Sequence, residues 1–268
     1  MKRIFIIFFV LFVTIMFAEQ RLVITSPELA EIIYQLDGAK NIVGITKECN
    51  YPPQIQNITK VGNFSSLNYE AILKLKPTLI FTSSLEQSKI ASKLKDFGFK
   101  VVQIYPKDVK TLESSIIEIG NLINRQEKAD SLSKYISSSI NHLNYDEKIK
   151  PKVFLEIYGN PLMTVSDNSF VGQLVKLAGG ENIFPQLPRD YSRISPEKII
   201  LRNPDVIITT YPGISSKYVK SRMGWSNINA VKNDRIYTIK DVNPDLILRA
   251  GPRIIEGIKA LHKVIYEK

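Results

Sequence analysis

Residues 68–80, Asn-Tyr-Glu-Ala-Ile-Leu-Lys-Leu-Lys-Pro-Thr-Leu-Ile, have a second version at residues 195–207, Ser-Pro-Glu-Lys-Ile-Ile-Leu-Arg-Asn-Pro-Asp-Val-Ile. Each version has a polar N-cap residue, a glutamate in the first turn, an Ile/Leu stripe, a proline and then a β-rich run, which predicts a helix followed by a strand. A second pair of similar segments, residues 35–42 and residues 176–183, precedes the two versions. Two such pairs in the same order predict two lobes of like construction, and a cleft between two lobes is a common place for a ligand.

Further predicted elements alternate around the two versions. Apolar periodicity and turn residues predict strands at 22–25, 41–46, 100–105, 153–158, 206–210 and 235–239, and helices at 27–36, 87–97, 169–178 and 252–266. This alternation predicts an α/β protein with two similar lobes, each built on a parallel sheet covered by helices.

A proline-free stretch separates the two halves. Residues 111–143 carry two helical stripes divided by the polar residues 124–126. The second helix, of about 18 residues, would be roughly 27 Å long, enough to bridge two lobes and to limit their closure if it is rigid. We therefore expect an N-terminal lobe at 19–109, a helical segment with the interlobe helix at 110–147, and a C-terminal lobe at 148–268.

The first 18 residues predict a secretory signal peptide. Lys2 and Arg3 form a short basic start, and residues 4–17 are almost wholly apolar. This apolar run is short for a membrane span, and the small residue Ala18 suits cleavage before Glu19. A retained membrane anchor is the alternative. No cysteine follows the apolar run, so we expect no bacterial lipid attachment and a soluble, exported mature protein.

Composition restricts the classes of function. The formal net charge is +10, but the lysines are scattered among acidic residues without a basic run, so nucleic-acid binding is not expected. The only cysteine, Cys49, excludes an intramolecular disulfide. His142 and His262 are the only histidines and both fall near predicted helix ends, so we expect no metal site and no cofactor.

Enzymatic motifs are also lacking. The sequence has no G-x-S-x-G elbow, no GxxxxGK[ST] loop and no Gly-rich dinucleotide turn, so we expect no catalytic residue and no enzyme. An enzyme on a doubly wound sheet and a pure interaction protein are the alternatives of other classes.

Several segments together resemble the periplasmic binding proteins of ABC importers for vitamin B12, ferric siderophores and haem. They are the two glutamate-bearing helices, Asn-Tyr-Pro-Pro at 50–53, Ala-Gly-Gly-Glu-Asn-Ile-Phe at 178–184, Gly-Trp-Ser-Asn-Ile at 224–228 and Arg-Ala-Gly-Pro-Arg-Ile at 249–254. The resemblance covers residues 22–261, and the B12-binding branch is nearest. It implies two α/β lobes joined by one long helix, with a small-molecule ligand between them. It also implies a periplasmic monomer whose partners are an inner-membrane ABC permease and its ATPase.

Glu70 and Glu197 are singled out by the internal repeat. A carboxylate in the first turn stabilises a helix by roughly 0.3–1 kcal/mol, so helix capping alone would explain both. In the family that the chain resembles, the matching glutamates, one on each lobe, dock onto arginines of the permease. The resemblance therefore implies a docking role for Glu70 and Glu197, which is compatible with capping.

Four residues are candidates for ligand contact. Phe64 and Tyr191 each lie six residues before the glutamate of their lobe, which predicts one aromatic ring on each rim of the cleft. In B12-binding proteins the matching positions carry tryptophans that touch the corrinoid. Tyr51 either faces the cleft or supports its Pro-Pro turn. The resemblance implies that Arg249 reaches into the cleft to bind polar or anionic ligand groups.

Neighbouring residues are expected to support these candidates. Arg253, in the first turn of the closing helix, is expected to be structural. Asp241 or Asp245 could hold Arg249 in place. Trp225 is expected in the core of the C-terminal lobe.

The expected cargo is a cobalamin-type corrinoid, with a ferric siderophore or haem as the alternative. Haem binders of the family ligate iron through a tyrosine or histidine in the cleft, and Tyr191 or Tyr51 could serve. Anionic ferric siderophores need several arginines, for which Arg249, Arg189 and Arg193 are the candidates.

Overall fold

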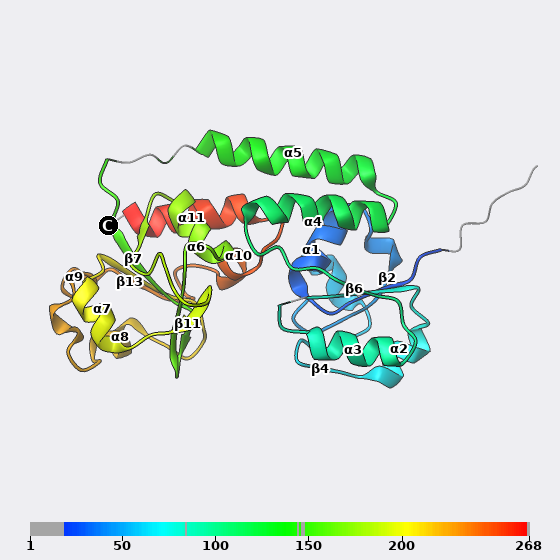
Figure 1. The fold of residues 1–268 in the computed structure, drawn as a ribbon, viewed down its shortest axis with the longest axis horizontal. Coiled ribbons are helices and arrows are strands. Elements are labelled where there is room, and N and C mark those ends of the chain that lie inside the picture. The colour runs from blue at the N-terminus through cyan, green and yellow to red at the C-terminus, as the bar shows by residue number, and fades with distance from the viewer. Residues whose placement is uncertain (1–18, 84, 144, 146–147, 267–268) are drawn as a thin grey trace, which may run out of the picture.

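The computed structural model describes residues 19–83, 85–143, 145 and 148–266. The expected signal peptide, residues 1–18, lies outside the described residues. Two lobes lie side by side in Figure 1, the N-terminal lobe on the right and the C-terminal lobe on the left, with two long helices across the top. In the described ranges no helix is long and apolar enough to span a membrane.

The N-terminal lobe is built on a parallel sheet. Its strands, in spatial order, are β2 (Ile42–Ile45), β1 (Leu22–Ile24), β5 (Leu79–Thr82) and β6 (Val101–Gln103). The other elements of this lobe are α1 (Pro27–Gln35), η1 (Ala39–Asn41), η2 (Pro53–Asn57), β3 (Gly62–Asn63), β4 (Ser66–Leu67), α2 (Tyr69–Leu75) and α3 (Ser88–Asp96). Strands β1 and β5 are buried along their whole length, as expected for a parallel sheet covered on both faces.

The C-terminal lobe repeats this plan. Its parallel strands are β10 (Glu181–Asn182), β7 (Lys152–Glu156), β12 (Val206–Thr209) and β13 (Ile236–Tyr237). Its helices are α6 (Phe170–Leu177), α7 (Pro196–Arg202), α8 (Ser216–Lys220), η3 (Trp225–Asn227), α9 (Asn229–Lys232), α10 (Pro244–Leu248) and α11 (Ile254–Tyr266). The two parallel sheets confirm the predicted fold class.

Two antiparallel sheets were not predicted, the two-stranded sheet of β3 and β4 and a three-stranded sheet in the C-terminal lobe. The strand expected at 153–158 ends at Glu156, and the chain then forms an antiparallel sheet of β8 (Tyr158–Gly159), β9 (Leu162–Val165) and β11 (Tyr191–Arg193), in the order β11-β9-β8. The polar residues around Tyr191 predicted a loop, but Tyr191 begins the strand β11. Strands of two to four residues are too short to give a clear alternating pattern.

The two versions of the sequence repeat have the same local geometry. Helices α2 and α7 each have seven residues and each ends at a non-glycine residue in the left-handed conformation, Lys76 and Asn203, both with φ of 46°. A left-handed residue ends a helix by redirecting the chain, and here a proline follows it. The repeat is thus a repeat of structure as well as of sequence.

The lobes are joined by α4 (Val109–Leu122) and α5 (Gln126–Leu143), which run antiparallel along the top of the molecule. Helix α5 has 18 residues, begins over the N-terminal lobe and ends over the C-terminal lobe (Figure 1). Sequence reasoning predicted both helices from their two apolar stripes, and the structure adds that they pack along each other.

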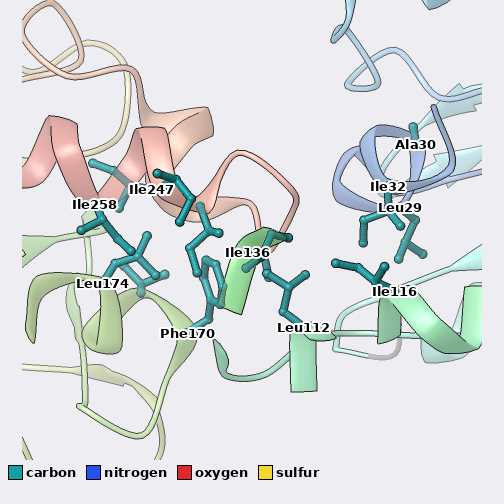
Figure 2. Packing of buried hydrophobic residues seen from close by; sticks show 14 of the residues in the cluster. Leu29, Ala30, Ile32, Leu112, Ile116, Ile136, Phe170, Leu174, Ile247 and Ile258 are labelled. Atoms are coloured by element: carbon teal, nitrogen blue, oxygen red, sulfur yellow. The ribbon is translucent and has the colours of Figure 1, made fainter. Parts of the chain in front are cut away.

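A single buried apolar cluster continues from one lobe to the other. Figure 2 shows Leu29 and Ile32 of α1 facing Ile116 of α4, while Leu112 of α4 lies near Phe170 of α6. Ile136 of α5, Leu174, Ile247 and Ile258 extend the cluster into the C-terminal lobe. Because packed cores resist deformation, this continuity restricts hinge motion between the lobes.

Candidate ligand cleft

A cavity of about 530 Å³ lies between the two lobes. This volume is within the range of roughly 300–1,000 Å³ that is usual for small-molecule sites. The N-terminal half supplies Pro27, Glu28, Phe64, Ser83, Leu85, Glu86 and Tyr105, and the C-terminal half supplies Ile157, Met163, Val171, Tyr191, Leu248 and Arg249. Several of these residues directly follow parallel strands, where ligands of α/β sheets usually bind.

Phe64 and Tyr191 are brought together at this cavity from opposite lobes. Phe64 lies in the turn between β3 and β4. Its N–H donates to Glu48 Oε2 (2.8 Å), and its carbonyl accepts a hydrogen bond from Gln87 Nε2 (2.8 Å). These two bonds hold the half-buried ring at the cavity wall. That either ring contacts a ligand stays a prediction.

Tyr105 is a cavity residue that sequence reasoning missed. Its hydroxyl lies 2.9 Å from the hydroxyl of Tyr191, so a hydrogen bond joins the two lobes across the cleft. Burial raises the pKa of both phenols, and the neighbouring phenol adds to the effect at Tyr105, so both are protonated at neutral pH. The sequence could have indicated Tyr105 by its position, because it follows β6 at the carboxyl edge of the sheet, where ligands usually bind.

Arg249 lines the cavity, but most of its donors are already engaged. The guanidinium donates to Glu31 Oε1 (2.8 Å), to Asn50 Oδ1 (2.9 Å) and to the Glu48 carbonyl (3.2 Å). It also forms an ion pair with Asp245 (2.8 Å). Of the two aspartates expected near Arg249, the structure therefore uses Asp245. The charge of this arginine is therefore already paired with two carboxylates, of which Glu31 is shared with Arg253.

Asp241, the other aspartate, accepts hydrogen bonds from the backbone N–H (2.7 Å) and hydroxyl (3.1 Å) of Thr238. It therefore organises its own turn and does not hold the arginine.

Glu31 of α1 connects the lobes through two arginines of the C-terminal lobe. It is 2% exposed and accepts from Arg249 and, in bidentate fashion, from Arg253 Nε and Nη2, both at 2.7 Å. Burial lowers the pKa of Arg253, but the hydrogen bonds and charge of Glu31 outweigh it and raise that pKa overall. Arg253 is thus structural, as expected.

Tyr51 lies beside this ion-pair cluster. Its ring centroid is 3.9 Å from the Arg253 guanidinium carbon, which is a cation–π contact. Tyr51 does not line the cavity among the described residues. The structure therefore separates it from Phe64 and Tyr191, and a direct contact of Tyr51 with a ligand stays a prediction.

Glu28 is a second cavity residue that sequence reasoning missed. It is the second residue of α1 and only 7% exposed. Ser26 Oγ donates to its carboxylate, and within the described part of the chain no lysine or arginine forms an ion pair with it. Burial raises the pKa of Glu28, against smaller opposing effects of Ser26 and Arg249.

Glu70 and Glu197 lie away from the cavity. Each is the second residue of its helix, α2 or α7, and each is exposed. Hydrogen bonds from its own N–H and from Ser195 lower the pKa of Glu197. Neither glutamate forms an ion pair with a described residue, and a docking role for either stays a prediction.

A second cavity, of about 580 Å³, lies within the C-terminal lobe. The antiparallel sheet separates it from the cleft, because Leu162 of β9 faces this cavity and Met163 faces the cleft. Its lining includes Glu197 and the buried Trp225, whose ring makes an edge contact with Phe154, as expected for a core residue. All of its walls belong to one lobe, so this cavity cannot close around a ligand by movement of the lobes.

No group of histidine, cysteine and acidic residues in the described part of the chain forms a candidate metal site. His262 instead stacks on Tyr145, with ring centroids 3.6 Å apart. Cys49 is buried beside Thr46, and burial raises the pKa of its thiol to about 11.

Comparisons with known proteins agree on one family. A family model described as periplasmic binding protein matches residues 22–243. An uncharacterized ABC transporter substrate-binding lipoprotein, YvrC of Bacillus subtilis, is 34% identical over 264 residues, with 95% of this chain and 82% of the relative covered. The vitamin B12-binding protein of Salmonella choleraesuis is 26% identical over 249 residues, covering 92% and 90%. A solved structure of a possible iron-binding periplasmic solute-binding protein from Staphylococcus epidermidis has a TM-score of 0.80 at 31% identity, covering 92% and 99%.

Proposed function

The chain belongs to the periplasmic binding protein family, and from this premise we propose that it captures a cobalamin-type corrinoid and delivers it to an ABC permease. Whatever its cargo, the chain is the substrate-binding component of an ABC importer. The observation that carries the corrinoid proposal is the interlobe cavity, whose aromatic and apolar walls come from both lobes. The protein would act outside the inner membrane, as its relatives do.

The chemistry of the walls supports a large, flat and mostly apolar ligand. Phe64 and Tyr191 approach the cavity from opposite sides, and aromatic rings bind the faces and edges of macrocycles well. Ile157, Met163 and Val171 add apolar surface on the C-terminal side. A ligand that touches both lobes stabilises the folded protein by mass action, which makes binding measurable by thermal shift.

Delivery to the permease is assigned to Glu70 and Glu197. Both carboxylates are exposed, one on each lobe, and their helices have the same length and the same ending. Exposed carboxylates can form bidentate contacts with arginines, and two such contacts define an orientation. The expected partners are a permease of the inner membrane and its ATPase.

An iron complex or haem is the second candidate cargo. The specific observation is the pair of phenols, Tyr105 and Tyr191, at the cavity, because phenol oxygen is a known axial ligand of haem iron. Ligation would require a phenol to lose its proton against its raised pKa. An iron–tyrosinate absorption band that disappears in Tyr191→Phe would favour this candidate.

The test is a calorimetric titration of the purified protein with cyanocobalamin, haemin and a ferric siderophore. We expect saturable one-to-one binding of cyanocobalamin at micromolar Kd or tighter, which is about −8 kcal/mol or more favourable. Phe64→Ala and Tyr191→Ala should each weaken this binding. Binding of haemin or the siderophore alone would move the cargo to iron, and binding of none would refute both candidates.

A further inference from the structure

We propose that the cleft selects a cargo that presents carboxamide groups, excludes one that presents carboxylates, and makes this choice through Glu28. The inference rests on the proposed function, because it concerns the cargo of the same cleft. Nothing in the sequence pattern singled out this residue. Its position in the structure, buried at the cavity wall, indicates the role.

Glu28 lies where a ligand would meet it. It is the second residue of α1, the helix that follows β1, so it lies at the carboxyl edge of the N-terminal sheet, and it lines the cavity between the lobes. At 7% exposed, it is an ionisable residue almost removed from solvent. Acidic residues are rarely buried to this extent unless they are paired.

The surroundings of Glu28 do not neutralise it. The nearest polar partner is the hydroxyl of Ser26 on its own element. Arg249 acts on it only through charge, and that charge is already matched by the ion pairs to Glu31 and Asp245. Glu31, which is also close, adds negative charge.

The rest of the cavity offers no compensating cation. Among the described residues that line it, the ionisable side chains are two glutamates, two tyrosines and one arginine: Glu28, Glu86, Tyr105, Tyr191 and Arg249. Arg249 is the single cation of this set, and carboxylates of the protein already occupy it. Lys107 and Arg189 line an adjoining cavity that shares Leu85, Tyr105 and Tyr191 with the cleft, but neither lines the cavity that contains Glu28. A carboxylate of the cargo placed beside Glu28 would therefore lose its hydration without gaining a cationic partner, which is strongly unfavourable.

A carboxamide satisfies Glu28 in both of its protonation states. Its N–H₂ donates to the ionised carboxylate, and its carbonyl accepts from the protonated acid. A cargo carboxylate repels the ionised form and can accept only one hydrogen bond from the neutral form. The preference for amides over carboxylates is therefore strongest when Glu28 is ionised.

A purely structural role is the competing explanation. A carboxylate in the first turn of α1 interacts favourably with the helix N-terminus, and Ser26 holds it there. Such a role would affect stability, and it would change the affinities for two ligands with the same corrin ring by the same factor, so their ratio would be the same in wild type and variant. The experiment therefore measures that ratio.

The probes are two corrinoids with the same ring: cyanocobalamin, whose peripheral groups are amides, and cobyrinic acid, whose peripheral groups are carboxylic acids. Calorimetry would compare wild type with Glu28→Gln, which keeps the shape, and with Glu118→Gln, which removes the same charge from an exposed position on α4. We expect wild type and Glu118→Gln to prefer cyanocobalamin at least tenfold. Glu28→Gln should reduce that preference at least tenfold.

An unchanged ratio in Glu28→Gln, with cyanocobalamin still bound, would overturn the inference and leave the proposed function standing. If wild type binds haemin and neither corrinoid, the corrinoid proposal fails, and the role of Glu28 is then tested with a second pair of ligands. The probes then are haemin and its dimethyl ester, and the ester should bind tighter in wild type but not in Glu28→Gln. Binding of none of the four probes would refute both proposals.

Discussion

Removal of the Glu31 carboxylate should destabilise the protein more than almost any other single substitution. Glu31 is 2% exposed and pairs with Arg249 and Arg253, each 10% exposed, through contacts of 2.7–2.8 Å. In Glu31→Ala, Arg249 keeps Asp245, but Arg253 loses the only ion pair it has among the described residues. Breaking a buried pair by removing one partner costs roughly 3–5 kcal/mol, because the remaining charge stays buried.

Two observables follow from this magnitude. The melting temperature of a protein of this size falls by about 2 °C or more per kcal/mol, so Glu31→Ala should melt about 6 °C lower or more. The loss should persist at high salt, since buried pairs are poorly screened. Calorimetric melting curves and urea titrations measure both.

Matched variants separate the charge effect from loss of the side chain. Glu31→Gln keeps the shape and one acceptor, so it should fall between wild type and Glu31→Ala. Glu118→Gln removes an exposed carboxylate from α4 and should change stability by less than about 0.5 kcal/mol. A loss below about 1 kcal/mol in Glu31→Ala would refute the reasoning, because it would mean that the two arginines find solvent or new partners at no cost.

Four further predictions concern other parts of the molecule. Burial raises the pKa of Glu28 above its value in the unfolded chain, so its stabilising contribution is present at acid pH and is lost as the pH rises through the folded-state pKa. In urea titrations from pH 4 to 8, the free energy of unfolding of Glu28→Gln should therefore increase relative to that of wild type as the pH rises. Glu70→Ala combined with Glu197→Ala should abolish cargo uptake by cells yet leave calorimetric affinity intact, and lost affinity would contradict the docking role. The buried Cys49 thiol, with a pKa of about 11, should react with a thiol reagent only after unfolding, and fast labelling of the native protein would contradict its placement. Ligand binding should change the radius of gyration in X-ray scattering only slightly, because the lobes share one core, and a large change would show a hinge.

The sequence was sufficient for those parts of the fold that depend on local patterns. The repeated Glu-bearing helix, its proline and the following apolar run are all consecutive in the chain, so α2 with β5 and α7 with β12 could be predicted. The length of α5 followed from its apolar stripe. The β8–β9–β11 sheet could not be predicted, since its strands are too short to show a period.

The candidate site was less predictable because its contacts join distant residues. Tyr105 and Tyr191 are 86 positions apart, and Arg249 and Glu31 are 218 apart. The sequence identified Arg249 as a candidate ligand residue, but whether its charge is free depends on a partner in the other lobe. Glu28 is similar, since an acidic residue in a first turn is ordinary until the structure shows it buried at a cavity.

The continuous core also determines how the chain can be divided. A break between α5 and β7 separates the two sheets without cutting either, yet each fragment would expose the apolar residues that now meet between α4, α5 and α6. Neither half is therefore expected to be a good expression unit. The two halves produced together should reassemble, with the paired charges of Glu31 and Arg253 specifying their alignment. The break point is thus suited to a split reporter whose reassembly a cleft ligand would strengthen.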